Sequence, residues 1–293
     1  MASLREIKNR IASVRSTRQI TSAMKMVASA KLHKAQGRIE NMLPYQQKLN
    51  AILTNFLGTD TTVESPYTAV RQVARVAVVA FSSNTSLCGA YNMNVVKLLE
   101  EVLEEYRSLG KDNIAIYPVG KKIEEAVRRM GYEPRGSYQQ MADKPSYEEA
   151  RGLAVELMDS FVTGQVDRIV LVYHHFKSAG TQVLLKEYYL PIDLQQTVSP
   201  GETSSTTAYL SDYIVEPAVD SLMAELLPKV LCQKIYTVLL DSSASEHAAR
   251  MMAMQTATDN ANDLIQDLTK QYNKGRQQAI TNELLDIIGG SMK

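Results

Sequence analysis

The sequence lacks tryptophan, and its 293 residues include only two cysteines, four phenylalanines and nine prolines. Two cysteines cannot build a disulfide framework, so the chain is not a small disulfide-stabilised secreted domain and suits a reducing compartment. It contains no run of 18 apolar residues, the length a membrane-spanning helix needs. A hydrophobic fraction of 45% with 22% charged residues is typical of a globular chain with one large domain or two ordinary ones.

Basic and acidic residues balance overall but are distributed unequally along the chain. Residues 1–57 carry ten Lys or Arg and two Asp or Glu, residues 58–217 carry 15 and 21, and residues 218–293 carry seven and nine. The basic first segment predicts an acidic partner, which could be nucleic acid, a membrane surface or another protein.

The first segment has the periodicity of one long helix. Apolar residues repeat at helical spacing, first at Leu4, Ile7, Ile11 and Val14 and, after a shift of frame, at Ile20, Met24 and Val27. Ser3 and Glu6 fit a capping box at its start. Pro44 is expected to kink the helix without ending it, and Gly58 to stop it, so we predict a helix over residues 3–57.

The last segment repeats this pattern over a greater length. Pro217 is well placed near a helix start, and we expect Gly289 and Gly290 to end the helix after Ile288. A ridge of small side chains, which would let a second helix approach closely, is formed by Ala249, Ala253, Ala257 and Ala261.

Strand-like and helical segments alternate between these two helices. Four segments rich in β-branched residues predict strands at Val73–Ser83, Asn113–Val119, Arg168–Phe176 and Thr181–Ile192. Helical stretches alternate with the first three, at Asn92–Leu109, Lys121–Met130 and Ser146–Val162. This order predicts a Rossmann-like α/β domain with a largely parallel sheet, to which the last strand adds an antiparallel edge.

The fold class that follows is α/β, in which a long antiparallel coiled coil of the N- and C-terminal helices carries the inserted domain. Residues 1–57 and 218–293 would form one shaft, and residues 58–217 the inserted domain, because helices beyond about 25 residues indicate a coiled coil. If the ends beside the domain align, the longer helix extends unpaired past about residue 272. That end carries Ile280, Leu284, Leu285, Ile287 and Ile288. Because such an apolar end is not left in water, it indicates a covering protein.

Several segments of the sequence resemble, in the same order, the gamma subunit of F-type ATP synthases. Ser3–Ala35 resembles the start of that family, and Ala244–Asn260 and Tyr272–Gly290 resemble its end. Ser86–Asn92 is similar to the turn after its first strand, and Tyr213–Pro217 to the entry to its last helix. The chain departs from the family at Ser86, where Gly is common, and at Ser291, where Ala is usual.

The resemblance implies a bacterial rotor subunit, the central stalk. In this family the paired helices turn inside a ring of three alpha and three beta subunits, and the α/β domain joins the epsilon subunit to the membrane ring of c subunits. Rotation couples proton flow to ATP synthesis or hydrolysis and regulates both. The resemblance implies no catalytic residue, cofactor or metal. It implies membrane association only through the complex, peripherally, at the cytoplasmic side of the bacterial inner membrane.

The resemblance also implies which residues contact partners. Contacts to alpha and beta are expected at Met24, Lys25, Lys31, Lys34, Arg250, Arg276, Gln277, Ile280, Thr281, Glu283, Leu284 and Ile287. Contacts to the c ring or epsilon are expected at Tyr188, Tyr189 and Leu190. Simpler explanations exist, because basic residues on a helix commonly form a solvated face and a Met at helical spacing is more often core.

Two other classes of protein fit the sequence less well. A nucleotide-binding enzyme would need a phosphate loop, but Ser83–Asn92 contains neither G-x-G-x-x-G nor G-x-x-x-x-G-K-[ST]. His174 and His175, adjacent on a strand, would point to opposite faces, which disfavours a metal site. A basic coiled coil that binds nucleic acid would show steep salt dependence, but it leaves the apolar end unexplained, so we expect no nucleic-acid partner.

Overall fold

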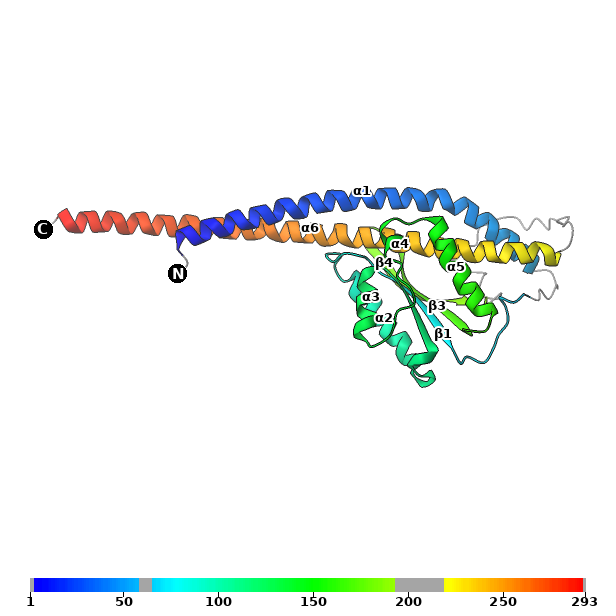
Figure 1. Cartoon of the computed structure of the whole chain (residues 1–293). Coiled ribbons are helices and arrows are strands. Elements are labelled where there is room, and N and C mark those ends of the chain that lie inside the picture. Colours follow the sequence, from blue (N-terminus) through cyan, green and yellow to red (C-terminus); the bar gives the residue numbers. More distant parts are fainter. Residues whose placement is uncertain (1–2, 58–64, 193–218, 292–293) are drawn as a thin grey trace. The chain divides into compact units, whose positions relative to one another are not determined.

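The computed structural model describes residues 3–57, 65–192 and 219–291. They separate into two compact units, one of Met1–Ala30 with Arg250–Lys293 and the other of Lys31–Ala249. We call these the helical unit and the sheet unit. Helices α1 (Leu4–Leu57) and α6 (Val219–Ser291) contribute to both (Figure 1). The expected domain boundaries after residues 57 and 217 adjoin or fall within segments outside the described residues, so they stay predictions.

Helix α1 begins in the capping box that its sequence predicts. The backbone N–H of Ser3 donates to Oε2 of Glu6 at 2.8 Å, and the backbone N–H of Glu6 donates to Oγ of Ser3 at 3.2 Å. These bonds satisfy donors that the first turn of a helix leaves without partners. Pro44 lies inside α1 without ending it, as expected, whereas Gly58 lies outside the described residues.

The packed face of α1 in the helical unit keeps a single frame, so the predicted shift of frame is wrong. A set of its buried and half-buried positions alternates by three and four residues, at Leu4, Ile7, Ile11, Val14, Arg18, Thr21, Lys25 and Ala28, with half-buried Ser22 and Met24 beside them. We call this face the seam; its spacing is that of a left-handed coiled coil. Ile20 and Val27 are 60% and 58% exposed. The apolar pattern predicted the wrong frame because the polar residues Arg18, Thr21 and Lys25 occupy seam positions, while apolar residues lie beside them.

Helix α6 has the same spacing in the helical unit, at Met251, Met254, Thr258, Ala261, Ile265, Leu268, Tyr272 and Gly275. Of the predicted alanine ridge in this unit, Ala261 is buried, whereas Ala253 and Ala257 are half-buried. The predicted ridge steps by four residues each time, so it does not follow the seam, which alternates steps of three and four. The expected helix end is also wrong, because α6 continues through both glycines to Ser291. A helical glycine costs only about 1 kcal/mol relative to alanine, which does not by itself end a helix.

The sheet unit contains four strands in the order β2-β1-β3-β4. They are β1 (Val76–Phe81), β2 (Ile114–Val119), β3 (Arg168–Ser178) and β4 (Thr181–Leu190). Strand β1 pairs in parallel with β2 and β3, and β4 pairs antiparallel with β3. The predicted parallel sheet with an antiparallel edge is therefore confirmed.

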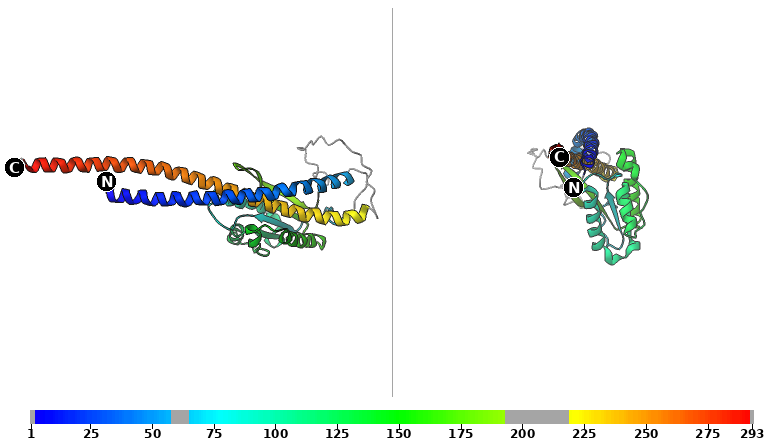
Figure 2. Two further views of the ribbon diagram at one scale, coloured as in Figure 1. Left: turned by 90° about the horizontal axis from the view of Figure 1, so that it is seen from above. Right: turned by 90° about the vertical axis from the view of Figure 1, so that its left-hand side faces the viewer.

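Helices cover both faces of this sheet (Figures 1 and 2). They are α2 (Tyr91–Glu105), α3 (Lys121–Arg129), α4 (Gln139–Asp143) and α5 (Tyr147–Val162), with short 3-10 turns at Arg107–Leu109 and Lys111–Asn113. Helices α2 and α3 pack on one face, and α5 packs with the first part of α6 on the other. Every residue of β1 is buried because both faces are covered. The sequence did not predict α4, since five residues are too few to show a period.

Candidate partner-contact surfaces and the switch point of the sheet

Two polar contacts join α1 to α6 across the seam of the helical unit. Oγ1 of Thr21 and Oγ1 of Thr258 lie 2.8 Å apart, and Nη1 of Arg18 donates to Oδ1 of Asn262 at 3.3 Å. Because residue numbers rise in α1 as they fall in α6, the two helices are antiparallel. Polar residues within an otherwise apolar seam fix the alignment of paired helices at a cost in stability.

The pairing reaches the first turn of α1 and leaves the end of α6 exposed. A Cβ added at Gly275 would lie 3.1 Å from Cδ2 of Leu4, so these residues are in close contact. Past this point, the exposed fractions are 48% for Ile280, 54% for Leu284, 61% for Leu285, 67% for Ile287 and 56% for Ile288. We call these five residues the apolar tip. Figure 1 shows the last turns of α6, in red, continuing past the start of α1, in dark blue.

Most of the residues of α6 that are expected to contact alpha and beta lie near the apolar tip. Arg276, Gln277, Thr281 and Glu283 are exposed, and Oγ1 of Thr281 donates to the backbone carbonyl of Gln277 at 2.9 Å. From residue 276 to 287 the helix rises about 17 Å. Half-buried Arg250 lies about 39 Å further back along α6 on the same rise and is not part of this group.

The expected contact residues of α1 differ in exposure. Met24 and Lys25 are half-buried, and Lys25 occupies a seam position, whereas Lys31 and Lys34 are exposed and belong to the sheet unit. The sequence analysis missed an exposed apolar stripe beside the seam, because it assigned Ile20 and Val27 to the packed face. This stripe contains Ile20, Met26 and Val27, which are 58–64% exposed. The apparent shift of frame at Ile20 is the sequence signal from which this stripe could have been predicted.

Of the three residues expected to face the c ring or epsilon, only Tyr188 is exposed. Its ring lies 5.1 Å from the guanidinium carbon of Arg168 and 5.7 Å from Nζ of Lys186. Tyr189 and Leu190 are 4% and 0% exposed, and burial raises the pKa of Tyr189 well above its usual value. These two side chains belong to the core, and their expected contact with a partner stays a prediction.

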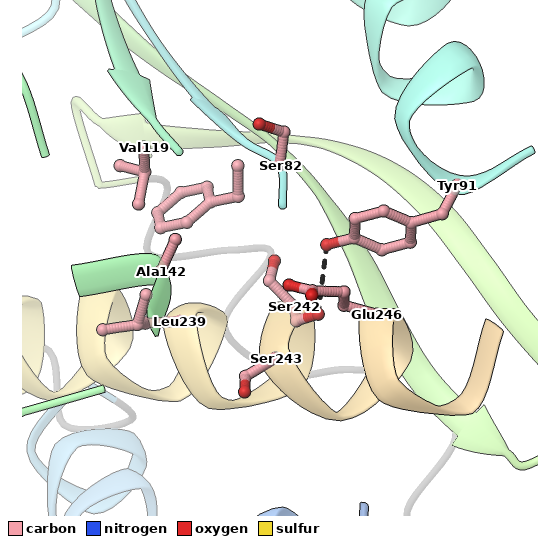
Figure 3. A pocket seen from close by; sticks show the side chains of 9 residues that line it. Ser82, Tyr91, Val119, Ala142, Leu239, Ser242, Ser243 and Glu246 are labelled. Carbon is pink, nitrogen blue, oxygen red and sulfur yellow. Dashed lines mark hydrogen bonds between the residues drawn. The ribbon is translucent and has the colours of Figure 1, made fainter. Parts of the chain in front are cut away.

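The place where doubly wound sheets bind ligands is filled by α6. Ligands of such sheets bind beyond the carboxyl ends of the strands, where the strand order reverses. In this sheet β1 has β2 on one side and β3 on the other, so the reversal lies at its carboxyl end. The cavity there has a volume of about 10 Å³ and is lined by Phe81, Ser82, Tyr91, Val119, Ala142, Leu239, Ser242, Ser243 and Glu246 (Figure 3). Such a volume holds about one water molecule.

The backbone donors beside this cavity are occupied by the chain itself. The N–H of Ile123 donates to Oγ of Ser82 at 2.9 Å, and the N–H of Lys121 donates to Oδ1 of Asn84 at 2.9 Å. These donors lie in the first turn of α3, whose backbone N–H groups have no partner within the helix. Side chains of the loop after β1 therefore satisfy the first turn of α3.

The two adjacent histidines point to opposite faces of β3, as predicted. His174 is 3% exposed, its ring stacks on Tyr91 at 4.4 Å, and burial lowers its pKa to about 4. Nδ1 of the exposed His175 lies 2.7 Å from Oδ2 of Asp241. Across residues 3–57, 65–192 and 219–291, no cluster of three His, Cys, Asp or Glu side chains could hold a metal ion.

These features define a class of protein that combines an antiparallel coiled coil, which has an exposed apolar end, with an α/β domain whose ligand crevice is filled by its own helix. The family model described as ATP synthase matches residues 3–292. The ATP synthase gamma chain of Bacteroides thetaiotaomicron is 63% identical over 298 residues, covering 100% of both chains. The chain belongs to the ATP synthase gamma-chain family.

Solved structures share this fold. A chain from the central stalk and c-ring structure of the Tetrahymena thermophila mitochondrial ATP synthase is 25% identical, with a TM-score of 0.57, covering 81% of this chain and 99% of that one. A chain of the Euglena gracilis mitochondrial ATP synthase, in rotational state 3, is 22% identical, with a TM-score of 0.67, covering 99% and 93%. None of the described helices is long and apolar enough to cross a membrane.

Proposed function

We propose that this chain is the central-stalk rotor of a bacterial ATP synthase. It would turn inside the head of alpha and beta subunits and couple proton flow through the c ring to ATP synthesis or hydrolysis. Its 63% identity to a bacterial gamma chain over the full length supports this role, as does its similarity to a chain of a solved central stalk and c ring.

The observation that carries the proposal is the apolar tip, which extends past the last contact with α1. Apolar surface gains free energy when a partner covers it, at roughly 25 cal/mol per Å². That gain is non-directional, so a sleeve around the tip can hold it while it turns. The polar residues next to it, such as Arg276 and Glu283, would add contacts that depend on the angle of the shaft.

In this proposal the chain does no bond chemistry and acts by shifting populations. Each angle of the shaft would stabilise one conformation of a beta subunit over the others, by as much as its contacts differ between them. The cavity of about 10 Å³ at the switch point supports a role without bound nucleotide. The exposed Tyr188 is the proposed contact with the c ring or epsilon, and the complex would hold the chain at the cytoplasmic face of the inner membrane.

The test is assembly of the complete chain with its alpha and beta subunits. The Leu284→Ser/Ile287→Ser variant should weaken assembly by about tenfold or more, since burying each such side chain is worth about 1.5–3 kcal/mol. The free chain should keep its stability, because these side chains are 54% and 67% exposed. Asp286→Ser, on the same exposed turn, is the matched control and should assemble like the wild type.

Two results would oppose the rotor. One is assembly of the Leu284→Ser/Ile287→Ser variant at wild-type affinity, which would show that the apolar tip does not hold the chain in the complex. The other is a failure of the wild-type chain to copurify with alpha and beta, combined with salt-dependent DNA binding or ATP binding by the isolated chain.

A further inference from the structure

Helix α6 is enclosed where it crosses the α/β domain of residues 65–192. Between residues 231 and 246, no side chain of α6 is exposed. Ile235 and Leu239 enter the core between the sheet and α5. The opposite ends of this stretch make polar contacts with the domain, and these contacts are directional.

At the end near Ser245, three hydrogen bonds join α6 to α2 and β3. The hydroxyl of Tyr91 donates to the backbone carbonyl of Ser242 at 3.0 Å (Figure 3). Oγ of Ser245 donates to the backbone carbonyl of His174 at 3.3 Å, and the imidazole of His175 meets the carboxylate of Asp241 at 2.7 Å. Asp241 is 7% exposed, and burial raises its pKa.

At the end near Leu231, two more contacts come from β4. The hydroxyl of Tyr189 donates to the backbone carbonyl of Leu231 at 3.1 Å, and Nζ of Lys234 donates to Oε1 of Glu187 at 2.7 Å. We call these five contacts the polar clamp. Its ends lie 14 residues apart on α6, which is about 21 Å along the helix axis.

Helix α1 has no comparable attachment to the domain. Among the described residues, its single side-chain hydrogen bond to residues 65–192 runs from Nη1 of Arg38 to the backbone carbonyl of Pro145, at 3.3 Å and exposed to solvent. In the sheet unit, Leu49 and Leu53 of α1 share an apolar cluster with α6, against which Tyr67 and Ile192 of the domain also pack. These contacts of α1 with the domain are apolar and have no preferred direction.

We propose that the polar clamp fixes the rotation of α6 relative to the α/β domain, so that torque passes between the domain and the shaft through α6, and α1 follows. The proposal rests on the rotor function proposed above. A helix that turns about its own axis slides its surface past its neighbours. Apolar packing has no preferred direction, whereas a hydrogen bond weakens steeply when its angle changes, and burial from water strengthens it.

The test measures torsional stiffness in the assembled complex of alpha, beta and the full chain. A bead attached to Glu101→Cys, an exposed position on α2, reports the angle of the α/β domain while the head is held in one state. The Tyr91→Phe/His175→Ala/Ser245→Ala variant removes three of the five contacts. The variance of the bead angle should rise about twofold or more, because parallel directional contacts add their stiffness.

Arg38→Ala, which removes the contact of α1, is the matched control and should leave the variance unchanged. Tyr91→Phe and Ser245→Ala alone should each raise it by less than the triple variant, which keeps the test valid if the triple variant folds poorly. Wild-type variance in all three clamp variants, or an equal rise in Arg38→Ala, would overturn the clamp. If the wild-type bead does not rotate with ATP, the rotor itself fails, which is a different result.

Discussion

At the scale of single residues, small side chains in the seam determine how closely the two helices of the helical unit can pack. Ala28 is 2% exposed, whereas Ala30, two residues on, is exposed. Ala28→Leu should lower the free energy of unfolding by about 1–3 kcal/mol, because added methyl groups in a packed contact force their neighbours apart. Ala30→Leu should change it by about 0.5 kcal/mol or less. Urea unfolding of both variants checks this, and equal stability would mean that residue 28 is not in a close contact.

The buried imidazole of His174 predicts a loss of stability in acid. Its pKa of about 4 in the fold lies below the usual value of about 6.5, so the unfolded chain binds a proton first as the pH falls. The stabilisation is complete above about pH 6.5 and is lost as the pH falls towards 4. Between about pH 7.5 and pH 5 the free energy of unfolding should fall by about 2 kcal/mol from this residue alone.

Replacing His174 isolates its share of that pH dependence. His174→Phe keeps a ring against Tyr91 and cannot titrate. Between the two pH values the free energy of unfolding of this variant should therefore fall by about 2 kcal/mol less than that of the wild type. His33→Gln, at an exposed position of α1, controls for the loss of a histidine and should behave as the wild type does. The same pH dependence in His174→Phe and wild type would show that the buried ring is not the cause.

Exposure of individual residues could be predicted only in part. The tip residues Leu284 and Ile287 were expected to be exposed because α1 is too short to cover them, and they are. Tyr189 and Leu190 were expected to contact a partner, but both are buried within this chain. Alternation along an edge strand does not show which residues another part of the chain will cover, and Tyr189 donates to Leu231, 42 residues away.

At the scale of elements, local sequence signals were strongest at helix starts and in buried strands. The capping box of Ser3 and Glu6 is an example that can be tested. Ser3→Ala should destabilise the first turn of α1 by about 1 kcal/mol, because Oγ of Ser3 accepts from the N–H of Glu6. Amide hydrogen exchange at residues 4–11 should become faster.

Ser13→Ala is the control for this prediction, since Ser13 is exposed and lies inside α1, past its first turns. Alanine there should slow exchange slightly or leave it unchanged, because its helix propensity is higher. Exchange in the first turn that is as slow in Ser3→Ala as in the wild type would mean that the cap contributes nothing.

At the scale of the whole molecule, the end of α6 should be dispensable for folding but not for coupling. Deleting residues 272–293 removes the apolar tip and leaves the described sheet unit, residues 31–57, 65–192 and 219–249, intact. The deleted chain should keep the near-UV circular dichroism of the sheet unit. Proton-coupled ATP synthesis by the complex should fall about tenfold or more, since a loss of about 1.4 kcal/mol of contact free energy already weakens assembly tenfold. Undiminished coupled synthesis would contradict the role given to the tip.

The sequence by itself determined the elements of this protein and the order in which they occur. Helical spacing, β-branched runs and caps act over a few neighbouring residues, so α1, the parallel sheet and its antiparallel edge could be predicted. Only the tertiary structure decided which faces are covered, because that depends on residues far apart in the chain. It placed Arg18 and Thr21 in the seam and left Ile20 exposed. It also put α6 at the switch point of the sheet, since burying the apolar face of that helix requires a partner surface that no local pattern describes.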